Sequence, residues 1–192
     1  MPQNEKTPTI DDTIILIGPM NVGKSTTATL LAEKLDMPRI PMDTIRFDYY
    51  KEIGYSEEKA KALIDSGDYK GLLHYWKPFE AHAVERILAD HQHCVIDFGA
   101  GHSVYDDDTL FARVEKALAP YKHVILLLPS PDLDQSVQIL KARFTLDVED
   151  MDIYDYFVKH PSNPKLAKAT VYTDSKTPEQ TCEDIIKLVK VT

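Results

Sequence analysis

One eight-residue stretch of the sequence combines residue types that bind phosphate groups. Residues 18–25 read GPMNVGKS and match the pattern G-x-x-x-x-G-K-[ST]. In this pattern the glycines let the backbone wrap around phosphates, and successive N–H groups at a helix start face the anion. Lys24 is placed to reach the β- and γ-phosphate oxygens, and Ser25 to ligate magnesium. The stretch therefore predicts a site for Mg²⁺ and a nucleoside triphosphate such as ATP.

The flanking sequence predicts the strand and the helix that this pattern requires. A β-branched apolar run over residues 13–17 predicts a strand that ends at Gly18. Apolar residues at helical spacing after Lys24 predict a helix that ends before Pro38. Thr26 is equally well interpreted as an ordinary residue of the first helical turn. The predicted nucleotide-binding residues are Gly18, Asn21, Val22, Gly23, Lys24, Ser25 and Thr26.

A carboxylate follows a second apolar run, Val95-Ile96-Asp97. An aspartate at the end of such a strand can reach magnesium directly or through a water molecule. The alternative is a plain loop carboxylate that caps the turn at Gly99. We predict that Asp97 and Ser25 are the metal ligands.

The rest of the chain alternates between apolar runs of strand length and helical patterns. Further strands are expected at 39–42, 93–97, 123–128 and 170–172, and helices over about 70–89 and 109–118. Additional helix starts are expected at Ser56, at Ser130 followed by Pro131, and at Thr177 with Gln180 as its capping-box partner. This alternation predicts a doubly wound α/β fold with a parallel sheet between two helical layers.

Composition favours one soluble domain that spans residues 1–192. Hydrophobic residues make up 43% of the 192 residues and charged residues 28%, which suits a packed core. Residues 1–12 are expected to be a loose leader, and the acidic, aromatic segment at about 144–168 a mobile lid. The net charge of −9 argues against a nucleic-acid partner, and the lack of a long apolar run argues against a membrane. Two cysteines indicate a reducing compartment, the cytoplasm, and nothing indicates an oligomeric state.

Five segments in order resemble the shikimate kinase family and its small-molecule kinase relatives. They read GPMNVGKST at 18–26, MDT at 42–44, WKPFE at 76–80, FGAG at 98–101 and HPSNPKLAKATVYT at 160–173. The resemblance spans about residues 13–190. It implies a P-loop NTPase three-layer sandwich, with a five-stranded parallel sheet in the order 2-3-1-4-5 and a lid segment over ATP. It also implies transfer of the γ-phosphoryl group of Mg-ATP onto a hydroxyl of a small molecule.

The resemblance also implies an acceptor site at two strand ends. Asp43 corresponds to the aspartate that contacts the attacking hydroxyl, and a carboxylate at a strand end can orient or deprotonate a hydroxyl. The alternative is that Asp43 caps the next helix. Gly99, Ala100 and Gly101 correspond to a glycine triplet where bare backbone approaches the acceptor. Without the resemblance, Gly99 and Gly101 would indicate a turn after the strand, and His102 would be expected to be a solvent-facing loop residue.

The chain departs from the family pattern at its cationic positions. Lys77 and Lys159 stand where the family has arginines that hold a carboxylate, and Pro41 replaces the first aspartate of a D-x-D pair. Lysine lacks the two-pronged guanidinium, which puts shikimate itself in doubt. Lys77 is still predicted to bind substrate, and Arg46 is either a second cationic contact or a surface residue. The aromatic residues near Arg46 are expected to line the acceptor pocket: Phe47, Tyr49, Tyr50 and Tyr55.

A cation at the start of the lid-like segment completes the predicted catalytic set. Lys141 and Arg143 precede a run of acids, and such a cation could stabilise charge on the phosphoryl group during transfer. Arg143 is chosen because its charge is permanent. The predicted catalytic residues are Lys24, Asp43 and Arg143. Alternative functions are a regulatory ATPase or binding protein on the same fold, or a nucleoside, sugar or antibiotic kinase.

Overall fold

A five-stranded parallel sheet organises the protein, which we describe from a computed structural model over residues 12–144 and 151–191. Its strands are β1 (Ile14–Ile17), β2 (Arg39–Pro41), β3 (Val95–Asp97), β4 (His123–Leu128) and β5 (Ala169–Tyr172). They pair in the order β2-β3-β1-β4-β5, and each neighbouring pair is parallel. The predicted order is confirmed. The predicted leader, apart from Asp12, lies outside the described residues.

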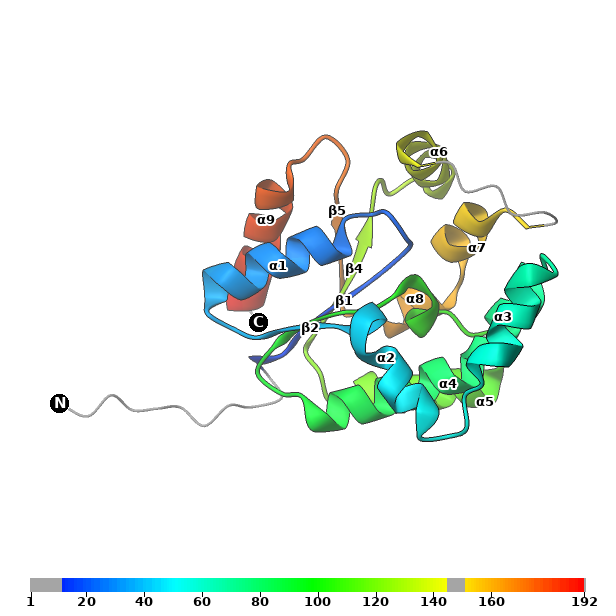
Figure 1. The fold of residues 1–192 in the computed structure, drawn as a ribbon. Helices are drawn as coiled ribbons and strands as arrows, with labels where there is room; N and C mark the ends of the chain where they lie inside the picture. Colours follow the sequence, from blue (N-terminus) through cyan, green and yellow to red (C-terminus); the bar gives the residue numbers. More distant parts are fainter. Residues whose placement is uncertain (1–11, 145–150, 192) are drawn as a thin grey trace.

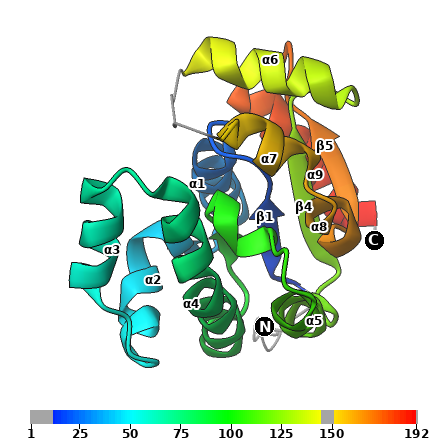
Figure 2. The same cartoon turned by 90° about the vertical axis from the view of Figure 1, so that its right-hand side faces the viewer.

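Helices cover both faces of this sheet, as a doubly wound fold requires (Figures 1 and 2). Those that follow β1 and β2 are α1 (Lys24–Leu35), α2 (Met42–Lys51), α3 (Glu57–Asp65) and α4 (Tyr69–Asp90). The 3₁₀ helix η2 (Ala100–Ser103) and α5 (Asp108–Leu118) follow β3. The remaining helices are α6 (Leu133–Arg143), α7 (Ile153–Lys159), α8 (Ser162–Leu166) and α9 (Pro178–Val191). Helices α1 and α9 lie side by side on one face, and α4 and α5 lie together on the other.

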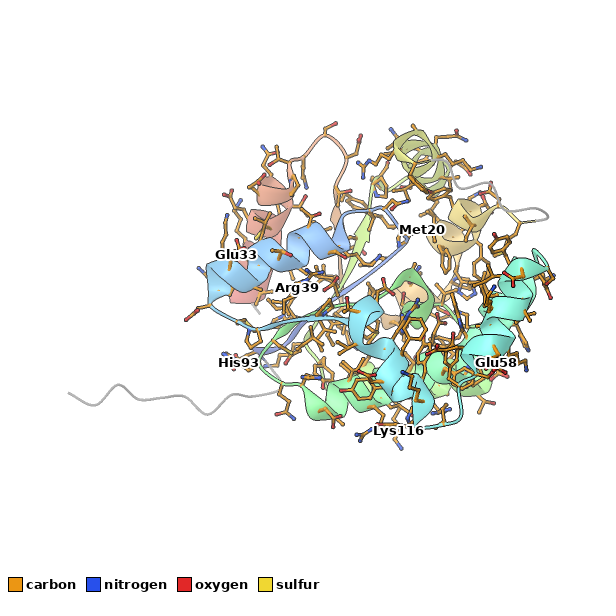
Figure 3. All side chains as sticks on the ribbon, viewed as in Figure 1. Met20, Glu33, Arg39, Glu58, His93 and Lys116 are labelled. Carbon is orange, nitrogen blue, oxygen red and sulfur yellow. The ribbon has the colours of Figure 1, made fainter. Side chains whose placement is uncertain are left out.

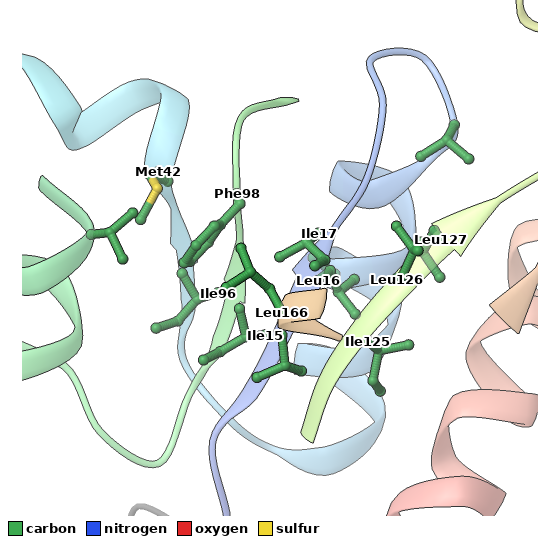
Figure 4. Packing of buried hydrophobic residues seen from close by; sticks show 14 of the residues in the cluster. Ile15, Leu16, Ile17, Met42, Ile96, Phe98, Ile125, Leu126, Leu127 and Leu166 are labelled. Atoms are coloured by element: carbon green, nitrogen blue, oxygen red, sulfur yellow. The ribbon is translucent and has the colours of Figure 1, made fainter. Parts of the chain in front are cut away.

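The central strands are buried along their whole length. Every residue of β1 and of β4 is buried, as expected for parallel strands that are covered on both faces. Figure 4 shows Ile15, Leu16 and Ile17 in the middle of this core, with Met42 at the start of α2 and Phe98 after β3 beside them. The strand ends that carry the predicted site are therefore anchored in the buried core.

Two of the three predicted helix starts are confirmed. Ser56 accepts a hydrogen bond from the N–H of Lys59 at 3.1 Å. The N–H of Thr177 donates to Oε1 of Gln180 at 2.8 Å, and the N–H of Gln180 donates to Oγ1 of Thr177 at 3.3 Å, which completes the capping box.

The start predicted at Ser130 is wrong. Helix α6 begins at Leu133, and the side chain of Asp132 accepts from the N–H of Gln135 at 3.0 Å. Aspartate is as good an N-cap acceptor as serine, and the observed cap, Asp132, lies two residues after the predicted one. Pro131 accordingly precedes the helix instead of opening it.

Two segments are more regular than the sequence indicated. The polar and aromatic stretch after β2 forms helix α2, in which Tyr50 is buried. The predicted lid segment forms α7 and α8 in its described part, with Ile153, Tyr154 and Phe157 buried. Residues 145–150 lie outside the described residues, so the lid remains a prediction. None of the described helices combines the length and the apolar character needed to cross a membrane.

Candidate nucleotide and acceptor site

The loop between β1 and α1 has the backbone of a phosphate-binding turn. Three of its residues have positive φ: Gly18 at 133°, Asn21 at 61° and Gly23 at 104°. At Gly18 a Cβ atom would lie 2.4 Å from the carbonyl oxygen of Leu127, so only glycine fits there. Among the described residues, no side chain caps the N-terminus of α1, whereas α3 to α7 each have a side-chain cap. The first N–H groups of α1 are thus available to an anion.

Lys24 lies at the centre of the predicted site. Its Nζ donates to the carbonyl oxygens of Gly18 at 2.8 Å and Pro19 at 2.7 Å, and the residue is only 8% exposed. Burial lowers the pKa of Lys24 to about 8, while the charges of Asp43 and Asp97 oppose this decrease. The two carboxylates, from different strand ends, therefore both lie within electrostatic reach of the loop lysine. Ser25 and Thr26 are exposed beside it in the first turn of α1.

Asp97 has a partner that sequence reasoning missed. Nε and Nη2 of Arg39 donate to its two carboxylate oxygens, each at 2.9 Å, and Nη1 of Arg39 donates to Thr29 on α1 at 3.0 Å. Figure 3 shows Arg39 on β2 beside α1. A carboxylate has about four lone-pair directions, so Asp97 can still accept from a metal-bound water. In the sheet, Asp97 on β3 is the register partner of Pro41 on β2. Pro41 is the residue that replaces the first aspartate of the D-x-D pair, so the Asp97 carboxylate lies next to that position.

Asp43 is an exposed residue in the first turn of α2 and does not cap that helix, because the N-cap position is Pro41. Its Oδ1 lies 3.5 Å from Nη1 of Arg46. A Cβ atom on Gly99 would lie 2.2 Å from the same Oδ1, so the carboxylate rests against the bare backbone after β3. The structure thus brings Asp43, Gly99 and the loop lysine together.

Lys77 is held inside the protein. Its Nζ donates to Oε2 of Glu80 at 2.7 Å and to the carbonyl oxygen of Gly101 at 3.0 Å, and both side chains are buried. A Cβ atom on Gly101 would lie 2.1 Å from Oε1 of Glu80. Sequence reasoning missed Glu80, although its position three residues after Lys77 on a predicted helix was a signal for an ion pair. Ala100 opens η2 between these two glycines.

The expected exposure of His102 on the acceptor side is wrong. His102 is fully buried instead of facing solvent, and its Nε2 lies 3.3 Å from the hydroxyl of Tyr50. Burial, with the nearby charge of Arg46, lowers the pKa of His102 to about 3, so its ring is neutral. Three of the aromatic residues expected to line a pocket contact one another, with ring centroids 5.4 Å apart for Phe47 and Tyr50 and for Tyr50 and Tyr55, and their role at an acceptor remains a prediction.

The phosphate loop is linked to the predicted lid by two hydrogen bonds. Nδ2 of Asn21 donates to the hydroxyl of Tyr154 on α7 at 3.0 Å, and this hydroxyl donates to the carbonyl oxygen of Phe144 at 2.7 Å. Figures 1 and 2 both show α7 next to the loop that precedes α1. Arg143, the neighbour of Phe144, is exposed at the end of α6. The backbone of the residue after Arg143 is therefore linked to the loop, whereas a catalytic role for the Arg143 side chain remains a prediction.

A cavity of about 890 Å³ lies between α4, the start of α5 and the start of α7. Lys77 forms part of its wall, so the cavity adjoins the Gly101 end of the predicted acceptor site. The charged residues that line it are Lys70, Lys77, Asp106, Asp107, Asp152 and Asp155. This cavity has room for a small molecule, and Lys77 is the predicted acceptor residue that lines it.

Comparisons with known proteins agree with this fold. The chain is 29% identical over 185 residues to a shikimate kinase of Streptomyces coelicolor, with 93% of this chain and 95% of that protein covered. Its fold matches a shikimate kinase from Acinetobacter baumannii in complex with shikimate, with a TM-score of 0.62, 16% identity and coverage of 97% and 95%. The fold also matches a shikimate kinase from Aquifex aeolicus with a TM-score of 0.59 and 19% identity. That match covers 93% of this chain and 96% of the other. No family model matches the chain.

Proposed function

We propose that this shikimate kinase-like chain, a small-molecule kinase, moves the γ-phosphoryl group of Mg-ATP onto a hydroxyl of a small-molecule acceptor. The observation that carries the proposal is that Asp43 and Asp97 both lie close enough to Lys24, at one edge of the sheet, for their charges to act on it. A buried cation at a phosphate loop and a carboxylate beside bare backbone are the parts that phosphoryl transfer needs. Similarity over nearly the whole chain to shikimate kinases supports the same reaction class.

Each part of the site has a role in this reaction. The N–H groups of residues 18–26 and Lys24 would hold the phosphates, and Ser25 and Asp97 would hold Mg²⁺. Mg²⁺, when bound, neutralises charge on the phosphoryl oxygens. Asp43 would orient the acceptor hydroxyl and take its proton, at the place where Gly99 leaves room for its carboxylate. Arg143 would approach from the lid side and balance charge during transfer.

The setting of the reaction follows from the same features. We place it in the cytoplasm, because both Cys94 and Cys182 are buried free thiols. The acceptor is a small molecule, since the cavity that Lys77 lines suits a ligand of that size. A net charge of −9 makes a nucleic-acid acceptor unfavourable.

The test separates acceptor handling from nucleotide binding with the variant Asp43→Asn. A metabolite library that includes shikimate, sugars, nucleosides and cyclitols is first screened for acceptor-dependent ADP release by the wild-type chain. With the best acceptor, Asp43→Asn should lower kcat at least about 100-fold, because a positioned general base contributes about 10²–10⁴-fold. Its Kd for Mg-ATP should stay within about threefold of the wild type, as measured by calorimetry.

Asp48→Asn is the matched control, since Asp48 is an exposed aspartate on the same helix. It should leave kcat and the Mg-ATP affinity unchanged. If Asp43→Asn loses Mg-ATP affinity and Asp48→Asn does not, the role assigned to Asp43 would be contradicted. An ATPase rate that responds to a protein partner and to no small molecule would contradict the kinase proposal itself.

A further inference from the structure

Arg39 connects the two residues that are proposed to hold magnesium, Asp97 and Ser25. Its Nε and Nη2 donate to the two carboxylate oxygens of Asp97, each at 2.9 Å, and its Nη1 donates to Oγ1 of Thr29 at 3.0 Å. The hydroxyl of Thr29 in turn donates to the carbonyl oxygen of Ser25 at 3.0 Å. A continuous series of hydrogen bonds therefore joins β2, β3 and the first turns of α1.

Arg39 reaches Asp97 from the side that faces away from the phosphate loop. In the parallel register Arg39 pairs with Val95, which lies two residues before Asp97 and therefore further from the carboxyl end of the sheet. Thr29 comes four residues after Ser25 in α1, so it lies about 6 Å further along the helix axis from the loop. A carboxylate has about four lone-pair directions, and this approach leaves those on the loop side for a metal-bound water.

The pair is buried, and its place in the fold separates it from an ordinary ion pair. The Asp97 side chain is 5% exposed and that of Arg39 is 30% exposed. A guanidinium with two parallel hydrogen bonds fixes the orientation of a carboxylate. Arg113 and Glu85 form the same kind of pair, at 3.0 and 2.6 Å, between α5 and α4 on the opposite face of the sheet from α1. Only the Arg39 pair is linked to residues proposed to bind a metal.

We propose that Arg39 is a positioning residue for magnesium, which fixes the Asp97 carboxylate and, through Thr29, its place relative to Ser25. The proposal rests on the proposed function, because it concerns the metal of that reaction. A carboxylate and a hydroxyl suit Mg²⁺, which prefers oxygen ligands. Such ligands depend on the groups that orient them. Arg39 acts through Asp97 and Thr29 and contacts neither the nucleotide nor the acceptor.

The first test uses Arg39→Met, which removes the guanidinium. The readout is the magnesium response, defined as the Kd for ADP in EDTA divided by the Kd for ADP in saturating Mg²⁺, and calorimetry measures it without turnover. Arg39→Met should weaken this response about tenfold or abolish it, because loss of a group that orients a metal ligand costs about 10–100-fold in metal affinity. The Kd in EDTA should stay within about threefold of the wild type. Loss of a positive charge alone would strengthen Mg²⁺ binding, so an unchanged or larger response would overturn the proposal.

Two further variants separate geometry from charge and from general loss of structure. Arg39→Lys keeps the charge without the two-pronged geometry and should lose the response as Arg39→Met does, whereas a full response would overturn the proposal. Arg113→Met is the matched control, since it breaks the two-pronged pair with Glu85, and its response should equal that of the wild type. Loss of the response in both arginine-to-methionine variants would indicate a general structural effect and would also overturn it.

Thr29→Val provides a milder variant in case Arg39→Met does not fold. A buried carboxylate without its partner can unfold a protein. Thr29→Val preserves the shape of the side chain and the pair of Arg39 with Asp97, and removes only the link to Ser25. Its magnesium response should fall about threefold, which corresponds to one hydrogen bond. An unchanged response would overturn the proposal.

The same measurements distinguish failure of this proposal from failure of the proposed function. A wild-type chain that binds ADP equally well in EDTA and in Mg²⁺ would refute the metal site of the proposed function and this proposal with it. A wild type that responds to Mg²⁺, together with a folded Arg39→Met that responds equally, would refute the role of Arg39 alone.

Discussion

Lys24 lies between the proposed nucleotide site and the proposed acceptor site, within reach of the charges of both Asp43 and Asp97. It is buried at the phosphate loop, donates to two loop carbonyl oxygens and is influenced by Asp43 and Asp97. Burial lowers its pKa to about 8, from an ordinary value of 10.5. A nucleotide's phosphates favour the charged ammonium and would raise this pKa again. Nucleotide binding should therefore be linked to protonation of Lys24.

This linkage predicts a pH dependence of Mg-ATP affinity. Below about pH 8 Lys24 is already protonated in the free protein, and the affinity should be constant. Above pH 8 binding requires proton uptake, so Kd should rise by up to about tenfold per pH unit as pH approaches 10. Calorimetry between pH 7 and pH 9.5 measures it. Lys24→Met should bind weakly at every pH, and an affinity of the wild type at pH 9.5 equal to that at pH 7 would contradict the shift.

Residues whose roles depend on neighbours in sequence could be predicted, and those whose roles depend on distant partners could not. The loop residues 18–25 form one contiguous motif, which predicts their geometry directly. Arg39 reaches Asp97 only because β2 and β3 pair in one register, which no local pattern indicates. His102 is buried beside the hydroxyl of Tyr50, which is distant from it in the sequence. Contacts between residues far apart in the sequence could therefore not be predicted.

Helix α7 contacts the phosphate loop through Tyr154. The hydroxyl of Tyr154 accepts from Asn21 and donates to Phe144, and the ring itself is buried. Asn21 has the positive φ of the loop, so this contact holds a strained residue in place. The position of α7 and the shape of the phosphate loop should therefore depend on each other.

Tyr154→Phe tests this dependence, because it removes one hydroxyl and keeps the buried ring. Two hydrogen bonds are lost, and the free energy of unfolding should fall by about 1–2 kcal/mol. Urea unfolding followed by fluorescence measures the change. Tyr172→Phe, on the exposed side of β5, is the control and should cost under about 0.5 kcal/mol. An equal effect of the two substitutions would argue against the contact.

The capping box of α9 gives a second prediction for an element. Thr177→Ala removes the acceptor for the N–H of Gln180, and the free energy of unfolding should decrease by about 0.5–2 kcal/mol. Thr177→Ser keeps the hydroxyl and should lose less than half of that amount. Thermal unfolding of the three proteins provides the comparison. Equal stability of Thr177→Ala and the wild type would show that the box does not hold the helix.

The start of a helix is difficult to predict where the sequence offers two equally good capping residues close together. Ser130 with Pro131 is a good helix start, yet Asp132 two residues later caps α6 instead. Helix α2 was not predicted because its mixed polar and aromatic residues lack one clear apolar face, and its packing against α4 stabilises it. By contrast, β1 and β4 were predicted correctly, since continuous apolar runs leave few alternatives.

For the whole molecule, the sheet order decides where chemistry can occur. The order β2-β3-β1-β4-β5 places the carboxyl ends of β1, β2 and β3 next to one another, and open α/β sheets bind ligands at such ends. The phosphate loop follows β1, Asp43 follows β2, and Asp97 ends β3. The resemblance to shikimate kinases predicted this order correctly. The partners that neutralise Lys77 and Asp97 became visible only in the folded chain.

The most direct test of the account measures binding of Mg-nucleotide to the folded chain. Urea unfolding of the wild type and of Lys24→Met is followed with and without Mg-ATP at about 100 times the wild-type Kd. The ligand should stabilise the wild type by about 2.7 kcal/mol and should have little effect on Lys24→Met. A folded wild-type chain that is neither stabilised nor saturably bound by Mg-ATP or any other Mg-nucleotide would contradict the central claim.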